Sequence, residues 1–135
     1  MMQAMTDFPV RRALDGAGRL EVLMEEQGGV CVWCAFDLSK PNARPTRDHV
    51  VPKIKGGPTR IENELASCGS CNAKRGHKAP SEFIEMCRNE RGLEPNVVHI
   101  AYRLDELSNM IAREGGLRKI RPYVEREAQR AHKLA

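Results

Sequence analysis

Two pairs of cysteines in the Cys-x-x-Cys arrangement constrain this 135-residue chain more than any other feature of its sequence. Cys31 and Cys34 form the first pair, and Cys68 and Cys71 form the second pair after 33 intervening residues. Each spacing places two thiolates in one tight turn, where they can grip a single tetrahedral ion. We therefore predict that the four cysteines together bind one structural zinc ion.

Two other interpretations of paired cysteines are a redox centre and a disulfide framework. A thioredoxin-like redox centre requires a βαβ pattern around one pair, which the sequence lacks. Disulfides require an oxidising compartment, whereas residues 1–9 contain no continuous apolar run typical of a secretion signal. No run of about 18 apolar residues predicts a membrane span either. We expect an intracellular, cytoplasmic protein without a membrane partner, and we assign the fifth cysteine, Cys87, to the core.

The predicted elements alternate between helices and two short strands. Aromatic residues make up only 4% of the chain, so the core is thin and benefits from a staple. Apolar periodicity predicts helices over 10–27, 72–77 and 81–91, two further helices after Asn96 and Leu117, and strands over 47–51 and 61–66. Ser81 and Asn96 are the expected N-caps. We assign Trp33 to packing in preference to base stacking.

Positive charge is concentrated on the segment between the cysteine pairs and just beyond it. Residues 44–78 carry eight basic and three acidic side chains, a net charge of +5, whereas residues 1–43 carry −2 and residues 79–135 carry +1. Such a patch suits a polyanion, and a solvated basic loop is the alternative. The candidate nucleic-acid contacts are Arg47, Lys53, Lys55, Lys74, Arg75, His77 and Lys78.

Two further sets of charged or polar residues leave alternatives open. His77 fits a phosphate contact, an extra metal ligand or a surface residue. The basic residues of the last predicted helix fit either a DNA contact or a solvated face, and we favour the solvated face because Glu125 and Glu127 lie among them.

Three polar residues in the same segment suit hydrolytic chemistry. His49 has a reference pKa of about 6.5, which suits a proton acceptor near neutral pH. Asp48 and Asn72 offer hard oxygen atoms that favour magnesium or manganese over a second zinc ion. Adjacent strand residues point to opposite faces, but at the end of a strand we expect Asp48 and His49 to converge on one phosphate.

Residues 31–78 closely resemble the HNH endonucleases, which share the ββα-metal, or His-Me, finger. The motifs that carry the resemblance are Cys-x-x-Cys, Asp-His-Val-Val-Pro, Gly-Gly, Asn and Cys-x-x-Cys-Asn-x-Lys, in that order. The resemblance implies that His49 is the general base, that Asp48 and Asn72 hold a catalytic Mg²⁺ or Mn²⁺ ion, and that Asn63 braces the loop that positions His49. This chain ends the motif with Asn72 rather than histidine, a variation that is common in the family and that leaves the choice of metal open.

The resemblance predicts an α+β fold: a small ββα-metal finger stapled by a four-cysteine zinc site and flanked by N-terminal and C-terminal helices. We expect residues 1–135 to form a single domain, with the finger core at about 28–80 and a C-terminal helical extension at about 93–135. The implied activity is hydrolysis of phosphodiester bonds in double-stranded DNA by a monomer or homodimer. The alternative is a non-catalytic zinc-containing module or accessory subunit that binds nucleic acid, which gives no reason for Asp48, His49 and Asn72 to occur together.

Overall fold

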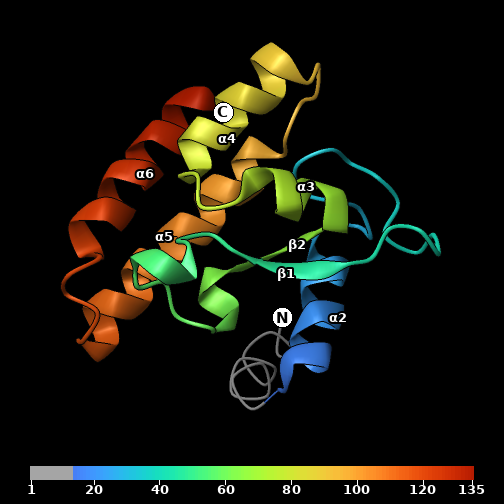
Figure 1. Ribbon diagram of the computed structural model, residues 1–135. Coiled ribbons are helices and arrows are strands. Elements are labelled where there is room, and N and C mark those ends of the chain that lie inside the picture. Colours follow the sequence, from blue (N-terminus) through green and yellow to red (C-terminus); the bar gives the residue numbers. More distant parts are fainter. Residues whose placement is uncertain (1–13) are drawn as a thin grey trace.

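The computed structural model describes residues 14–135, in which helices surround a two-stranded antiparallel hairpin (Figure 1). This arrangement is the α+β fold that the sequence predicted. The elements are α2 (Gly16–Glu26), β1 (Thr46–His49), the 3-10 turns η1 (Lys53–Lys55) and η2 (Ile61–Asn63), β2 (Glu64–Ser67), α3 (Gly69–Arg75), α4 (Pro80–Glu90), α5 (Val97–Glu114) and α6 (Arg121–Leu134). Residues 10–13 of the first predicted helix lie outside the described residues.

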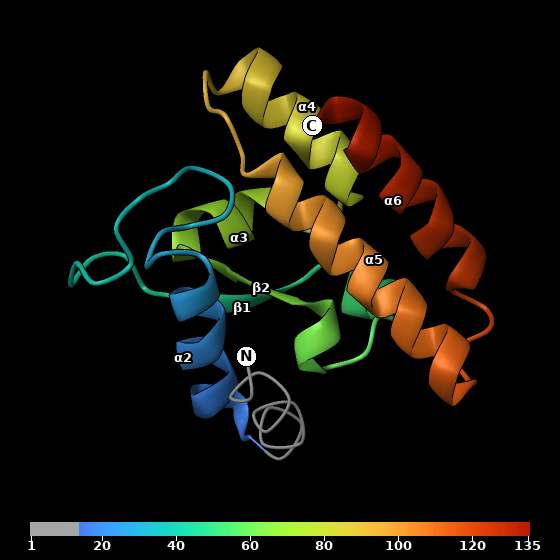
Figure 2. The same ribbon diagram turned by 180° about the vertical axis from the view of Figure 1, so that it is seen from behind.

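Helices cover both faces of the hairpin. Helix α2 lies on one side of it and α3 on the other, while α4, α5 and α6 form a helical layer next to α3 and η2 (Figures 1 and 2). The register pairs Asp48 with Leu65 and His49 with Glu64. Directly opposed residues share a face of the sheet, so the side chains of His49 and Glu64 lie on the face toward α2, and that of Asp48 lies on the other face.

Both strands are shorter than the sequence predicted, because Asn63 replaces the ladder at the loop end of the hairpin, where His49 pairs with Glu64. The Asn63 Oδ1 accepts a hydrogen bond from the amide of Val51 at 2.8 Å, and the Asn63 carbonyl accepts one from the amide of Val50 at 2.8 Å. The chain therefore leaves the sheet after His49. Residues 61–63, predicted as strand, form the turn η2 instead.

The core lies between the hairpin and the helical layer. Trp33 is fully buried and packs edge-on against Phe83 of α4, with ring centroids 4.8 Å apart. This contact confirms the packing role predicted for Trp33. Cys87 is also fully buried, as its assignment to the core predicted.

The first turn of α4 departs from the prediction that Ser81 caps it. The helix starts at Pro80, and the residue in the cap position, Ala79, supplies no side-chain hydrogen bond. Glu127 of α6 accepts hydrogen bonds from the Ser81 amide at 2.8 Å and from its hydroxyl at 2.9 Å. A carboxylate from a distant helix therefore satisfies a donor that a local cap would otherwise bind.

The C-terminal helices are packed onto the finger rather than extending away from it. Helix α5 contacts α6, η2 and β2, and Asn96 caps it by accepting a hydrogen bond from the His99 amide, as predicted. That residues 1–135 form a single domain stays a prediction. No helix in the described part of the chain is long and apolar enough to cross a membrane.

Candidate active site and metal centre

The four predicted zinc ligands lie together at one end of the hairpin. Their sulfur atoms are all within 4.8 Å of one another, and the Sγ atoms of Cys34 and Cys68 are 3.8 Å apart. A tetrahedral zinc ion with bonds of about 2.3 Å to sulfur separates its ligands by about 3.8 Å. The donors and their spacing therefore fit a four-thiolate zinc site, which has no open position for chemistry.

Hydrogen bonds to sulfur support this cluster. The amide of Trp33 donates to Cys31 Sγ and the amide of Cys71 donates to Cys68 Sγ, each at 3.4 Å. Arg91 Nη1 donates to Cys71 Sγ at 3.5 Å. The hydrogen bond with the Cys71 side chain lowers the pKa of Cys31 to about 4. The same contact raises the pKa of Cys71, and burial raises the pKa of Cys34. The backbone amides and Arg91 are the donors that stabilise a thiolate, which is the form that binds metal.

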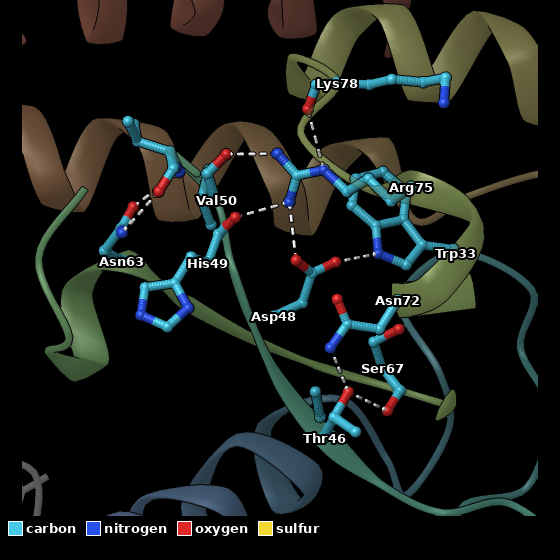
Figure 3. A network of polar contacts seen from close by, with 12 residues as sticks. Trp33, Thr46, Asp48, His49, Val50, Asn63, Ser67, Asn72, Arg75 and Lys78 are labelled. Carbon is cyan, nitrogen blue, oxygen red and sulfur yellow. Dashed lines mark hydrogen bonds and ion pairs between the residues drawn. The ribbon is translucent and has the colours of Figure 1, made fainter. Parts of the chain in front are cut away.

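The carboxylate of Asp48 points into the interior of the protein and is almost completely buried (Figure 3). Its Oδ2 accepts a hydrogen bond from Trp33 Nε1 at 2.8 Å, and its Oδ1 accepts one from Arg75 Nη1 at 2.9 Å. Burial raises the pKa of Asp48, while the Arg75 cation and the two hydrogen bonds act in the opposite direction. A carboxylate has about four acceptor sites, so Asp48 keeps some capacity for a metal ion, but below the surface.

Arg75 is a structural residue and not the nucleic-acid contact that the sequence predicted. Its exposed fraction is 0%. Besides Asp48, it donates to the carbonyl oxygens of His49 at 2.6 Å, Val50 at 2.5 Å and Lys78 at 3.1 Å (Figure 3). These contacts tie the end of β1 to the end of α3, and they leave the guanidinium without a surface to offer to DNA.

Asn72 of α3 lies over the same face of the hairpin as Asp48. Its Nδ2 donates to Thr46 Oγ1 at 2.8 Å, and that hydroxyl donates to the Ser67 carbonyl at 3.2 Å (Figure 3). The Asn72 amide oxygen accepts no hydrogen bond from any of residues 14–135, and it is the kind of hard donor that Mg²⁺ and Mn²⁺ prefer. Because Asn72 follows Cys71 directly, the sulfur cluster also fixes its position.

His49 ends β1 with its ring half-buried on the opposite face. Its Nε2 lies 2.9 Å from Thr59 Oγ1. Burial lowers the pKa of His49 below its usual value, while the carboxylates of Glu64 and Asp48 act in the opposite direction. The ring opens on a groove of about 540 Å³, here called the His49 groove, which is lined by Gly16, Ala17, Leu20, Pro45, Thr46, Arg47, His49, Lys53 and Thr59.

The structure thus groups Asp48 with Asn72 and places His49 in a separate, adjacent groove. Thr46 borders both, because it lines the His49 groove and binds the Asn72 amide. The three side chains therefore do not converge on one point within this arrangement.

Asn63 makes the bracing contacts that the family resemblance implied. Its Nδ2 donates to the carbonyls of Val51 at 3.1 Å and Pro58 at 2.9 Å, in addition to the bond that its Oδ1 accepts. Gly57 makes this closure sterically possible, since a Cβ atom there would lie 1.8 Å from the Val51 carbonyl oxygen. The loop after His49 is thereby held at three points.

The remaining predicted nucleic-acid contacts lie at or near the surface. Arg47 lines the His49 groove and donates to Glu64 Oε2 at 3.0 Å. Lys78 is partly buried, and its ammonium donates to the Lys74 carbonyl at 3.3 Å. The others are exposed: Lys53, Lys55, Lys74 and His77.

Three residues near His49 escaped the sequence argument. Thr46 and Thr59 belong to no recognised motif, and only the fold brings them next to Asn72 and His49. Glu64 is fully buried opposite His49, where Arg19 at 2.8 Å and Arg47 at 3.0 Å neutralise it. The sequence offered one indication that Asp48 is buried. A buried Trp33 indole N–H requires an acceptor, and Asp48 provides it.

Comparison with known proteins agrees with the motif. A family model described as HNH endonuclease matches residues 31–88, and no curated protein matches the chain. Among solved structures, the chain is similar to the crystal structure of the Type II-C Cas9 enzyme from Actinomyces naeslundii, with 17% identity, a TM-score of 0.48 and coverage of 96% of this chain. The chain spans 12% of the length of that protein. The family model for HNH endonucleases therefore covers the segment 31–88, which contains both cysteine pairs and the Asp48-His49 motif.

Proposed function

We propose that this chain is a metal-dependent endonuclease that hydrolyses phosphodiester bonds in DNA, with His49 as the general base. The observation that carries the proposal is the position of His49 at the end of β1, half-open to a groove that contains Arg47 and Lys53 and that none of the acidic residues between 14 and 135 lines. The family match to residues 31–88 supports a nuclease-type function. The basic groove supports a polyanionic substrate.

The role of His49 follows from its contacts. When Nε2 carries the proton and donates a hydrogen bond to Thr59 Oγ1, Nδ1 keeps a lone pair that can accept a proton from water. A lowered pKa keeps the ring neutral, and therefore basic, at physiological pH. Arg47 and Lys53 would bind the phosphate and hold it near this water, and the loop braced by Asn63 would fix the direction of the ring.

The oxygen donors of Asp48 and Asn72 are of the type that Mg²⁺ and Mn²⁺ prefer. Asn72 offers an open amide oxygen, Asp48 offers a carboxylate below the surface, and water and substrate phosphate commonly complete the shell of Mg²⁺. Such an ion supplies electrostatic stabilisation of the negative charge that develops on the phosphate and the leaving oxygen. General-base assistance contributes only about 10²–10⁴-fold of the roughly 10⁶–10¹⁷-fold typical of enzymes, so positioning and electrostatics must supply the larger part.

Nicking of supercoiled plasmid by the His49→Ala variant tests this proposal. We expect the rate to fall by about 10²–10⁴-fold or more, with zinc content and circular dichroism unchanged. His132→Ala is the matched control, because His132 is exposed on α6 and is not among the predicted site residues; its rate should stay near that of the wild type. Undiminished nicking by His49→Ala would refute the assignment, and a wild-type protein that binds DNA without metal-dependent cleavage would favour the non-catalytic alternative.

The oligomeric state follows from the same assay. One finger cuts one strand, so a monomer should produce nicked circles at every protein concentration. A homodimer should produce linear plasmid in proportion that rises with protein concentration.

A further inference from the structure

Two basic residues outside the HNH segment lie in the connection between α5 and α6. Helix α6 begins at Arg121, so Arg118 and Lys119, which the sequence assigned to the last helix, precede it. They border a second groove of about 530 Å³, here called the connector groove. Its chief lining residues are Lys55, Gly56, Leu117, Arg118, Lys119 and Ile120.

Three contacts hold this connection against the turn η1 and the loop that follows it. Gly56 packs so closely on the connection that a Cβ atom there would lie 3.1 Å from Ile120 Cγ2. The ammonium of Lys55 lies 5.3 Å from the centroid of the Tyr123 ring in α6. The ion pair between Arg60 and Glu114, at 3.0 Å, fixes the end of α5 to the same loop. The connector groove is therefore a fixed part of the fold.

The turn η1 joins the connector groove to the His49 groove. Lys53, its first residue, lines the His49 groove, and Lys55, its last residue, lines the connector groove. A 3-10 helix rises about 2 Å per residue, so the backbone positions of the two lysines are separated by about 4 Å along the axis. Between them, the side chain of Ile54 is 71% exposed. The two grooves are thus neighbours across η1, one at His49 and the other on the C-terminal extension.

The charge along the two grooves is of one sign. Within residues 14–135, Lys53, Lys55, Arg118 and Lys119 form no ion pair, and no acidic residue of that range lines either groove. The nearby carboxylate of Glu125 is already paired with Arg121 at 2.9 Å. Ile120 is apolar and nearly buried beneath these cations. A sugar–phosphate backbone, with charged oxygens and apolar deoxyribose faces, has the complementary chemistry.

We propose that the connector groove is a second DNA-binding surface, which holds the backbone of a duplex on the flank of the phosphate bound at His49. The proposal rests on the proposed function, because that function places a DNA phosphate in the His49 groove. Duplex DNA carries one negative charge per about 1.7 Å of its axis, so a duplex that follows both grooves meets all four unpaired cations. The C-terminal extension then increases affinity without taking part in the chemistry.

The test measures the salt dependence of DNA binding by the double variant Arg118→Ala/Lys119→Ala. The probe is a fluorescent duplex of random sequence, titrated at several salt concentrations without added magnesium or manganese. Loss of two phosphate contacts should reduce the slope of log K against log salt by about 1.8, since each contact contributes about 0.9. The single variant Lys55→Ala should reduce it by about 0.9. Zinc content and circular dichroism report that both variants fold.

The matched control is Arg126→Ala/Lys133→Ala, which removes the same charge from exposed positions of α6 that line neither groove. Its slope should equal that of the wild type. An equal fall in slope for both double variants would show a general charge effect and overturn the proposal, as would no measurable binding by the wild type. A slope unchanged in Arg118→Ala/Lys119→Ala, with an altered mass in sedimentation, would assign the groove to a second copy of the chain instead.

A nicking assay on the wild-type protein distinguishes failure of this proposal from failure of the proposed function. Binding is measured without the catalytic ion, so the slope remains informative even if the wild-type protein never nicks DNA. A normal slope in the connector double variant together with metal-dependent nicking by the wild type would overturn the connector surface and leave the nuclease assignment intact.

Discussion

The two faces of β1 present neighbouring residues to very different surroundings. On one face, Asp48 is buried and both its oxygens accept hydrogen bonds from Trp33 and Arg75. On the other face, His49 keeps one short contact, to Thr59, and opens on a groove. The buried face uses its polar groups to fix the hairpin, while the open face keeps free capacity to accept a proton. Adjacency in the motif therefore does not give Asp48 and His49 the same surroundings in this chain.

Removing zinc should have the largest effect, because both faces depend on the sulfur cluster. Structural zinc contributes roughly 10–16 kcal/mol in such sites, and the net stability of a domain is about 5–15 kcal/mol. We expect a chelated sample to lose its native circular dichroism, and added magnesium without zinc to restore no cleavage. Re-addition of zinc is the control. Native circular dichroism after complete zinc removal would show that the faces hold their shape independently of the cluster.

Arg75→Ala addresses the buried face alone. It leaves the Asp48 carboxylate buried without its charged partner, and breaking a buried pair in this way destabilises proteins by about 3–5 kcal/mol. Urea unfolding should report this loss. Lys74→Ala, at an exposed neighbouring position on the same helix, should change the free energy of unfolding by no more than about 0.5 kcal/mol. Equal free energies of unfolding for the two variants would show that the Arg75–Asp48 pair does not stabilise the buried face of the hairpin.

The pH dependence of cleavage addresses the open face and should show the smallest effect. His49 is a base only when neutral, so the rate should fall as pH decreases through its pKa. Because burial lowers that pKa, the acid limb of log kcat/KM should lie below about pH 6.5. A divalent cation nearby acts in the same direction, since it repels the imidazolium ion.

Lys53→Ala sharpens this measurement. Lys53 is one of the cations that lower the pKa of His49, so its removal should move the acid limb toward higher pH. Lys74→Ala is again the control, with the limb in the wild-type position. An acid limb at or above pH 6.5 in the wild-type protein would contradict a pKa of His49 that is lowered by partial burial.

The sequence predicted the parts of the site that depend on local spacing. The two Cys-x-x-Cys turns predicted the sulfur cluster, and the resemblance implied the bracing role of Asn63. The sequence did not predict the burial of Arg75, because the pattern of residues in the short polar helix α3 does not indicate which basic side chain points into the core. The hairpin stops at His49, and the carbonyls of His49 and Val50 need donors there. Arg75 lies within reach of both, which is a property of tertiary packing.

The cap that Glu127 provides for α4 has a practical consequence for anyone who wishes to transplant this finger. The family match ends at residue 88, inside α4 (Pro80–Glu90), and a fragment cut at that point would carry the start of the helix without the carboxylate that binds it. Grafts that keep the chain through α6 retain that acceptor. Shorter ones need a substitute at the first turn, such as serine or aspartate in place of Ala79.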